Sequence, residues 1–375
     1  MTEPRYSPLH QLHVDAGASF TDFAGWQMPV SYGSDLAEHH AVRSAAGIFD
    51  ISHMAEIEVT GTDAAAYLDY ALAGKISAVS IGQAKYSLLL NEHGGIIDDL
   101  VVYRRGEKSF LIVANAGNRT PVVAALHDRT ASFSDLELVD RSDDYALIAV
   151  QGPGSRGIVE RALGVDLTEL KYYWSTPSEF AGQPLLIGRT GYTGEDGFEL
   201  YIATAHAAAL WETLVGAGGA DLVPAGLASR DTLRLEAGMP LYGHELGTET
   251  FPVQAGLGRV VALGKEGDFV GRDAVEVGPQ PDHRVLVGLV TEGKRAGRAG
   301  YGVFVAQPDG VSPEAAPVGE ITSGALSPTL GYPIAMAYVE PRLAVPSTQL
   351  FIDVRGSRIP ASVVALPFYK RETTR

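Results

Sequence analysis

The 375-residue sequence contains no cysteine. This absence excludes disulfide bonds, thiolate metal sites and cysteine nucleophiles, so any chemistry must come from carboxylates, histidines, hydroxyls or a bound cofactor. The sequence also lacks the uninterrupted run of about 18 apolar residues that a membrane-spanning helix needs. Its first residues match neither a secretory signal nor an Arg-rich transit peptide. We therefore expect a soluble protein of the bacterial cytoplasm that has no membrane partner.

Positive charge is scarce, since 29 lysines and arginines face 45 aspartates and glutamates, for a formal net charge of −16. The acidic residues are spread along the chain, so we do not expect nucleic acid as a partner. The glycines of RTGYTGEDGFELY recur every three residues and do not open a helix, which excludes a dinucleotide-binding fingerprint. Phosphate-loop and zinc-protease motifs are absent too, and His39 and His40 have the wrong spacing to share a metal on a helix face. We expect no metal site.

Hydrophobic periodicity divides the first 250 residues into alternating helices and strands. Apolar residues at three- and four-residue spacing predict helices over 35–50, 62–74 and 205–218. Residues 86–103, YSLLLNEHGGIIDDLVVY, predict a hairpin, because two β-rich runs flank a turn that contains glycine. Hairpins with helices laid across them indicate an α+β fold rather than a doubly wound parallel sheet.

The pattern changes after residues 266–284, EGDFVGRDAVEVGPQPDHR. From there to the end the chain consists of short strands, glycines and prolines, a composition typical of a small β-barrel or sandwich. We place a domain boundary near residue 278, which gives an N-terminal region over 1–278 and a C-terminal domain over 279–375.

Two adjacent carboxylates, Asp98 and Asp99, interrupt the otherwise apolar second strand of the hairpin. Because side chains alternate along a strand, they must point to opposite faces and cannot form a dyad that shares one proton. One of them could lie at an edge or in solvent. Asp99 could stabilise the turn at Gly94 and Gly95, or it could exchange a proton with a ligand amine in a cleft.

Two other charged residues are candidates for ligand binding. Glu199 interrupts the strand GFELYI, where it could grip a flat ligand edge with two parallel N–H donors, such as a pterin or guanine, or pair with an arginine. Arg230 could hold a ligand carboxylate or fix its helix to the sheet. Glu195 and Asp196 lie among glycines, and we expect them to be solvated turn residues.

Eight blocks of sequence resemble the aminomethyltransferases, the T proteins of the glycine cleavage system. The blocks follow one another from about residue 5 to residue 370, and they are DFAGWQMPVSY, AVRSAAGIFDISHM, KYSLLLNEHGGIIDDLVVY, IAVQGP, RTGYTGEDGFEL, AGLASRDTLRLEAGMPLYG, EITSGALSPTLGYPIAMAYV and PFY. The resemblance thus covers nearly the whole chain.

This resemblance implies three small domains around a central folate site, with two interleaved α+β subdomains in the N-terminal region and a C-terminal β-barrel. It also implies an activity in glycine catabolism. The family transfers the one-carbon unit from the aminomethyl-dihydrolipoyl arm of H protein to tetrahydrofolate, which yields methylenetetrahydrofolate and ammonia. The implied partners are lipoylated H protein and, indirectly, the P and L proteins. Folate and lipoyl groups supply the organic chemistry, with no metal and no flavin.

Carried over from the family motifs, Asp99 is the essential acid, next to the folate amine that attacks the one-carbon unit. Asp98 then has a structural or solvent-facing role. Glu199 is the pterin-holding glutamate and Arg230 a folate-contacting arginine. The other implied folate contacts are Met54, Tyr86, Asn115, Tyr192 and Tyr369. Of these, Tyr86 and Met54 are the expected packing partners of the folate rings.

Three related classes compete with this interpretation. The folate-binding parts of sarcosine and dimethylglycine dehydrogenases are fused to a flavin domain, and this sequence has neither its fingerprint nor the length for it. Folate-binding proteins linked to iron–sulfur assembly carry a cysteine between glycine and tyrosine, which is absent here. A folate-binding module that has lost catalysis stays open, although the presence of Asp99, Glu199 and Arg230 argues against it.

Overall fold

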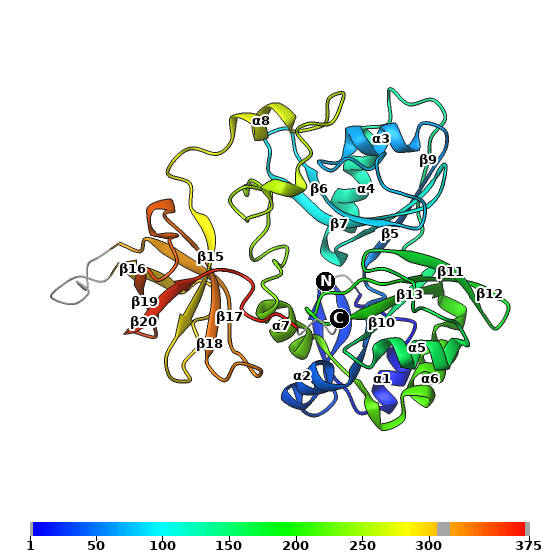
Figure 1. Ribbon diagram of the computed structural model, residues 1–375, viewed down its shortest axis with the longest axis horizontal. Helices are drawn as coiled ribbons and strands as arrows, with labels where there is room; N and C mark the ends of the chain where they lie inside the picture. The colour runs from blue at the N-terminus through cyan, green and yellow to red at the C-terminus, as the bar shows by residue number, and fades with distance from the viewer. Residues whose placement is uncertain (1–2, 306–315, 372–375) are drawn as a thin grey trace. The chain divides into compact units, whose positions relative to one another are not determined.

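The computed structural model describes residues 3–305 and 316–371, which divide into two compact units (Figure 1). The first unit comprises Met1–Leu89, Ile97–Arg230 and Ala262–Val270, and the second comprises Leu90–Ile96, Asp231–Val261 and Gly271–Arg375. Helices and hairpins are mixed in the way that the predicted α+β class requires, and this prediction is confirmed. In the described part of the chain, every helix is too short or too polar to cross a membrane.

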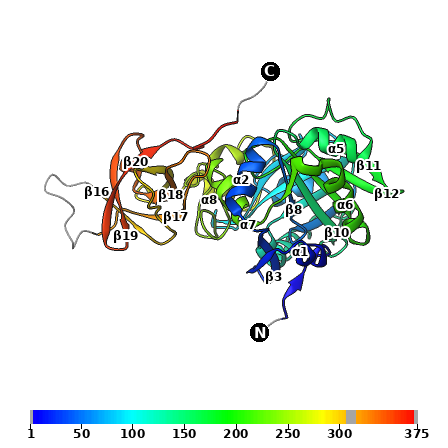
Figure 2. The same ribbon diagram turned by 90° about the horizontal axis from the view of Figure 1, so that it is seen from below.

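A six-stranded sheet organises one part of the first unit. Its strands, in spatial order, are β11 (Ser175–Phe180), β12 (Gln183–Gly188), β13 (Gly197–Ala203), β10 (Tyr145–Gln151), β4 (Ala46–Asp50) and β14 (Leu222–Pro224). Neighbours are antiparallel except β4 and β14. Helices α1 (His10–Asp15), α5 (Ser155–Leu163) and α6 (Ala207–Gly218) accompany this sheet (Figure 2). Phe198 and Leu200 of β13 join the core that α5 and α6 cover, so Glu199 lies on the opposite face.

A five-stranded sheet organises the other part of the first unit. Its strands, in spatial order, are β6 (Ala84–Leu90), β7 (Ile96–Gly106), β8 (Ser109–Ala114), β5 (Ala55–Thr60) and β9 (Glu137–Asp140). The adjacent strands β6 and β7 confirm the predicted hairpin. Helices α3 (Ala64–Ala71) and α4 (Arg119–Asp128) cover one face and share a core with Leu100 and Val102. By alternation, Asp98 points to this covered face and Asp99 points away from it.

The N-terminal segment forms a small sheet and the helix α2 (Asp35–Ser44). The sheet consists of β1 (Arg5–Tyr6), β3 (Trp26–Ser31) and β2 (Ser19–Phe23), in that spatial order. Ser34 caps α2, because its hydroxyl accepts a 3.2 Å hydrogen bond from the amide of Ala37. The prediction that this helix continues to residue 50 was wrong, since 46–50 form strand β4. All five residues of β4 are buried, and a short apolar run is compatible with either a buried helix or a central strand.

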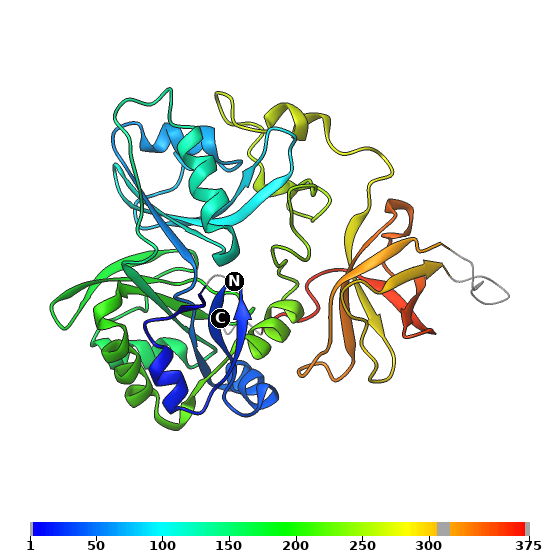
Figure 3. The ribbon, with the colours of Figure 1, turned by 180° about the vertical axis from the view of Figure 1, so that it is seen from behind.

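The second unit contains the predicted barrel, which is closed (Figure 3). Its strands, in order around the barrel, are β15 (Val285–Thr291), β18 (Pro333–Val339), β17 (Gly319–Leu326), β16 (Gly302–Val305), β19 (Gln349–Val354) and β20 (Ser357–Val364). Alternate residues such as Leu289, Ala337 and Val363 fill its core. The remaining helices are α7 (Leu227–Glu236), α8 (Arg272–Val277) and the 3-10 turns η1 (Ala116–Asn118), η2 (Thr204–His206), η3 (Gly219–Asp221), η4 (Gly258–Val260) and η5 (Pro341–Leu343).

Candidate active site

Asp99 lies near the start of β7, on the face of the sheet that α3 and α4 leave uncovered. Tyr86 donates a 2.9 Å hydrogen bond from its hydroxyl to Asp99 Oδ2, and Asn115 Nδ2 donates a 2.8 Å bond to Oδ1. Burial raises the pKa of Asp99, although both hydrogen bonds act in the opposite direction. Within residues 3–305 and 316–371, no arginine or lysine forms an ion pair with this carboxyl. Asp99 is therefore an ionisable acid held by two neutral donors.

The turn at Gly94 and Gly95 is stabilised by Asn91 and not by Asp99. Asn91 Oδ1 accepts hydrogen bonds of 2.9 Å from the amides of His93 and Gly95, and the Asn91 amide donates to the Gly95 carbonyl at 2.8 Å. These contacts are the local side-chain bonds that Asn commonly forms in turns. The role in the turn that the sequence left open for Asp99 is thus filled by another residue.

Asp98 is completely buried, so the expectation that one acid of the pair could lie at an edge or in solvent was wrong for this residue. Its Oδ2 accepts from the backbone amide of Asn115 at 2.9 Å. Its Oδ1 accepts from the side-chain nitrogens of Asn115 at 2.9 Å and Asn118 at 2.6 Å. The two acids point to opposite faces, as predicted, and yet both bind the carboxamide of Asn115.

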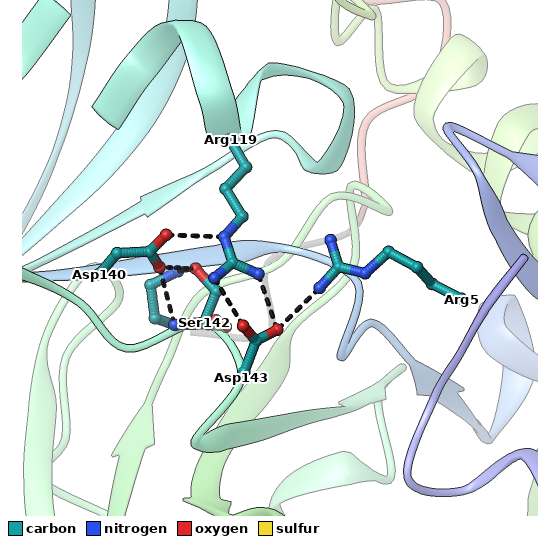
Figure 4. A network of polar contacts seen from close by, with 6 residues as sticks. Arg5, Arg119, Asp140, Ser142 and Asp143 are labelled. Carbon is teal, nitrogen blue, oxygen red and sulfur yellow. Dashed lines mark hydrogen bonds and ion pairs between the residues drawn. The ribbon is translucent and has the colours of Figure 1, made fainter. Parts of the chain in front are cut away.

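The turn that carries these asparagines is anchored by Arg119, the first residue of α4 (Figure 4). Arg119 pairs with Asp143 through both terminal nitrogens at 2.7 and 2.8 Å, and its Nε donates to Asp140 at 2.7 Å. Arg5 adds a second 2.7 Å contact to Asp143. Bidentate pairing fixes the plane of a guanidinium and therefore restricts the chain from which it projects.

Glu199 lies in a cluster of hydroxyl groups on the uncovered face of β13. Thr190 donates a 2.6 Å hydrogen bond to Glu199 Oε2, and Tyr103 lies 3.4 Å from the same oxygen. Tyr103 also contacts Thr190 at 2.7 Å and Tyr201 at 3.2 Å. In the part of the chain that the structure describes, Glu199 forms no ion pair with an arginine and receives no hydrogen bond at Oε1. The buried ion pair considered from the sequence is therefore absent there.

Arg230, in α7, lies with its guanidinium carbon 4.8 Å from the ring centroid of Tyr192. Burial lowers the pKa of Arg230, and Tyr192 and Glu199 partly offset this effect. An arginine remains charged over the whole physiological pH range, so Arg230 is a half-buried cation. Burial, followed by the charge of Arg230, lowers the pKa of His53 to about 4. Half-buried Met54 follows His53 directly.

The predicted site residues of the first unit thus fall into connected groups. Tyr86 and Asn115 contact Asp99, and Tyr192 contacts Arg230. Electrostatic interactions of Tyr86 with Tyr192 and of Arg230 with Glu199 link these groups. Tyr369 belongs to the second unit, where its backbone amide donates a 2.8 Å hydrogen bond to the carbonyl of Glu236.

Tyr173 interacts with both candidate acids, and the sequence reasoning did not select it. Burial raises its pKa, and the charges of both Glu199 and Asp99 contribute, so it lies within electrostatic range of both acids. Its backbone has a left-handed φ of 60°, which a bulky residue seldom adopts outside constrained sites. The sequence contains no signal for this conformation, because two aromatic residues in a loop do not indicate a left-handed backbone.

The expectation for Glu195 and Asp196 was wrong. Glu195 is buried and accepts a 3.0 Å contact from Arg43, and Asp196 pairs with Arg189 through two contacts of 2.6 and 2.9 Å. The partner of Glu195 lies far away in the sequence, and the partner of Asp196 lies at the other end of the turn. The glycine-rich context alone therefore could not reveal either ion pair. Across the described ranges, no three histidine, aspartate or glutamate side chains are grouped to hold a metal ion.

Comparison with known protein families places this site in context. The GCVT N-terminal domain matches residues 9–265, and the Glycine cleavage T-protein C-terminal barrel domain matches residues 284–370. The chain therefore belongs to the glycine cleavage T-protein family, as its resemblance predicted.

Curated relatives and a solved structure match almost the whole chain. The chain is 57% identical to an aminomethyltransferase of Cutibacterium acnes, over 99% of this chain and 100% of that protein. It is 55% identical to an aminomethyltransferase of Streptomyces avermitilis, over 98% of each. The crystal structure of glycine cleavage system aminomethyltransferase T from Bartonella henselae superposes with a TM-score of 0.90 at 37% identity, covering 99% of both chains.

Proposed function

We propose that this chain is the aminomethyltransferase of a glycine cleavage system. It accepts the one-carbon unit from the aminomethyl-dihydrolipoyl arm of H protein and transfers it to tetrahydrofolate, with release of ammonia and formation of methylenetetrahydrofolate. The full-length similarity to named aminomethyltransferases supports the reaction class. The observation that carries the assignment of the site is Asp99, an acid that two neutral donors hold at 2.8 and 2.9 Å.

The surroundings of Asp99 suit a substrate that carries a positive charge. Tyr86 and Asn115 satisfy one lone pair on each carboxylate oxygen, and further lone pairs stay available. The carboxylate has no cationic partner among the described residues, so a substrate amine or a developing cation would be its first counter-charge. In the proposed role Asp99 orients the folate amine, accepts its proton and stabilises positive charge on the transferred unit.

Glu199 and Arg230 are proposed to hold the two ends of tetrahydrofolate. The hydrogen bond from Thr190 fixes one oxygen of Glu199, and the carboxylate still has the capacity to accept the two parallel N–H donors of a pterin. Arg230 supplies a positive charge for the anionic part of the ligand, and its contact with Tyr192 restricts the guanidinium. Met54, Tyr86, Asn115, Tyr192 and Tyr369 complete the proposed set of folate contacts.

The remaining features of the proposal concern partners and organisation. Lipoylated H protein is the proposed direct partner, and the P and L proteins act on the same lipoyl arm at other steps. Residues 1–278 are proposed as the folate-binding region and 279–375 as the barrel domain. We propose the bacterial cytoplasm as its location, and a reaction that needs neither metal nor flavin.

The test is the release of ammonia from aminomethyl-loaded H protein, with and without tetrahydrofolate. We expect rapid release that depends on tetrahydrofolate, with methylenetetrahydrofolate formed in equal amount. Equal release without tetrahydrofolate would contradict the proposed acceptor. Folate binding without any stimulation of release would also contradict the proposal and would favour a folate-binding module. Adding H protein without its lipoyl group provides the control, since it cannot carry the aminomethyl unit.

A further inference from the structure

We propose that Asp98 is a positioning residue that acts on Asp99 through Asn115. This inference rests on the proposed function of Asp99 and assigns a role to the neighbouring acid, which does not face the substrate side of the sheet. Asp98 holds Asn115 at two points, because Oδ2 accepts from the backbone amide and Oδ1 accepts from the side-chain amide, both at 2.9 Å. The side-chain amide of Asn115 is in turn a direct donor to Asp99.

The orientation of the Asn115 carboxamide follows from its surroundings. Its nitrogen lies 2.9 Å from Asp98 Oδ1, 2.8 Å from Asp99 Oδ1 and 3.0 Å from the Asp99 carbonyl oxygen. All three neighbours are acceptors, so a flipped amide would place its own oxygen against them. Asp98 thereby helps to ensure that Asn115 presents N–H groups, rather than a carbonyl oxygen, to Asp99.

The rest of the turn is rigid enough to transmit this constraint. Asn118 Nδ2 donates to Asp98 Oδ1 at 2.6 Å and lies 3.3 Å from the Ile97 carbonyl. The next residue, Arg119, is fixed by Asp140 and Asp143. Loss of the Asp98 carboxylate would therefore remove one of the acceptors that orient the Asn115 side chain, while the contacts of Arg119 still hold the start of α4.

Asp98 and Asp99 are also coupled through charge. Burial, with a smaller contribution from Asp99, raises the pKa of Asp98 to about 7. Adjacent buried acids titrate as a coupled pair, because the charge of either one disfavours ionisation of the other. Tyr86 from β6 and Tyr173 before β11 also face Asp99, and burial raises the pKa of both, so they stay neutral near pH 7. The charged group at the start of α4, Arg119, is paired with Asp140 and Asp143.

The test compares Asp98→Asn with the unaltered protein in tetrahydrofolate-dependent ammonia release. We expect kcat to fall by about 10- to 100-fold, because Asn115 would hold Asp99 in a less precise position, while KM for tetrahydrofolate changes by less than about 3-fold. The ionisation of Asp98, whose pKa is about 7, should disappear from the kcat profile and leave a single ionisation on the acidic limb, because Asp99 ionises while Asp98 is still neutral. An unchanged pH limb would overturn the proposal.

Asp69→Asn is the matched control, since Asp69 is a half-buried acid of the same unit that serves only backbone amides. Its Oδ1 accepts from Ile76 at 2.5 Å and from Ser77 at 2.9 Å. We expect this variant to lose stability and to keep the original pH limb. A double-mutant cycle of Asp98→Asn with Asn115→Ala should be non-additive in kcat, because both changes remove one positioned amide. Additive losses would contradict action through Asn115.

A second measurement does not depend on folding of the Asp98 variant or on the enzymatic reaction. Carbon-13 NMR of labelled aspartate carboxyl groups follows the ionisation of Asp98 in the unaltered protein and in Asp99→Asn. Coupling predicts that Asp98 ionises at lower pH in the variant, and an identical titration would refute it. If the unaltered protein shows no tetrahydrofolate-dependent release of ammonia while Asp98 still ionises at lower pH in Asp99→Asn, the proposed function fails and the coupling of the two acids stands.

Discussion

Replacement of Asp99 by asparagine separates the chemistry of this site from ligand binding. The structure can accommodate the change, because the oxygen of the new amide can still accept from Asn115 Nδ2. The amide nitrogen would then face the Tyr86 hydroxyl, whose oxygen can accept a hydrogen bond. The substitution therefore removes the negative charge and the proton acceptor with little change in shape.

The expected loss follows from the role of the carboxylate. Positioned general acid–base groups contribute about 10²- to 10⁴-fold, so kcat should fall by that factor, or about 3–5 kcal/mol of transition-state stabilisation. The affinity for tetrahydrofolate should change by less than about 3-fold, since Glu199 and Arg230 are unaltered. Burial raises the pKa of Asp99, so the stability that this carboxyl contributes is complete below its unfolded pKa and is lost as pH rises through the folded pKa. At neutral pH the free energy of unfolding of the variant should therefore equal or exceed that of the unaltered protein.

The assay combines single-turnover ammonia release with equilibrium binding of tetrahydrofolate and urea denaturation at pH 7. Loss of turnover with retained binding and retained stability is the expected pattern. Normal turnover with weak folate binding would show that Asp99 is a ligand contact and that another group handles the proton. Low stability together with low turnover would indicate a structural role and refute the reasoning above.

Three further predictions concern Glu199, Asp50 and Glu56. Glu199→Gln places an N–H donor opposite the N–H donors of the pterin. The Kd for tetrahydrofolate, measured by equilibrium dialysis, should therefore rise by at least about 30-fold, while kcat at saturation changes by less than about 3-fold. In Asp50, burial raises the pKa, but the hydrogen bond and charge of His13 at 2.9 Å, together with hydrogen bonds from Ser7 and Ser52, leave the pKa lowered. The resulting stability is present above the unfolded pKa and is lost as pH falls, so Asp50→Asn should cost about 3–5 kcal/mol in urea unfolding at pH 7. Both carboxyl oxygens of Glu56 are buried without a hydrogen-bond partner among the described residues, and burial raises its pKa well above the ordinary value. The stability of the unaltered protein should therefore decline as pH rises above the unfolded pKa, and Glu56→Gln should abolish that decline and raise the free energy of unfolding by about 1 kcal/mol at pH 8. An unaltered pH dependence in the last two variants would contradict the assigned ionisations.

The prediction at Ala46–Asp50 failed for a reason that is general to buried segments. These residues continue an amphipathic helix in sequence, and their apolar character fits a helix as well as a strand. They form β4 because β10 and β14 pair with it at its two edges, and all five of its residues are buried. Only the positions of those two strands, which begin about 100 residues or more later, distinguish the two possibilities.

The sequence by itself determined the alternation of the two faces of β7 and β13. That periodicity is a local property of an extended chain, so it placed Asp98 and Asp99 on opposite faces and set Glu199 apart from its apolar neighbours. Motif similarity then singled out Asp99, Glu199 and Arg230 as the residues of functional interest.

The tertiary structure decided which partners those residues have. Asn115 reaches Asp99 from the end of the neighbouring strand β8, and Tyr103 and Thr190 reach Glu199 from other strands and loops. Such contacts depend on strand order and register, which hydrophobic periodicity does not encode. For the same reason a sequence that correctly separated two acids could not reveal that one asparagine joins them.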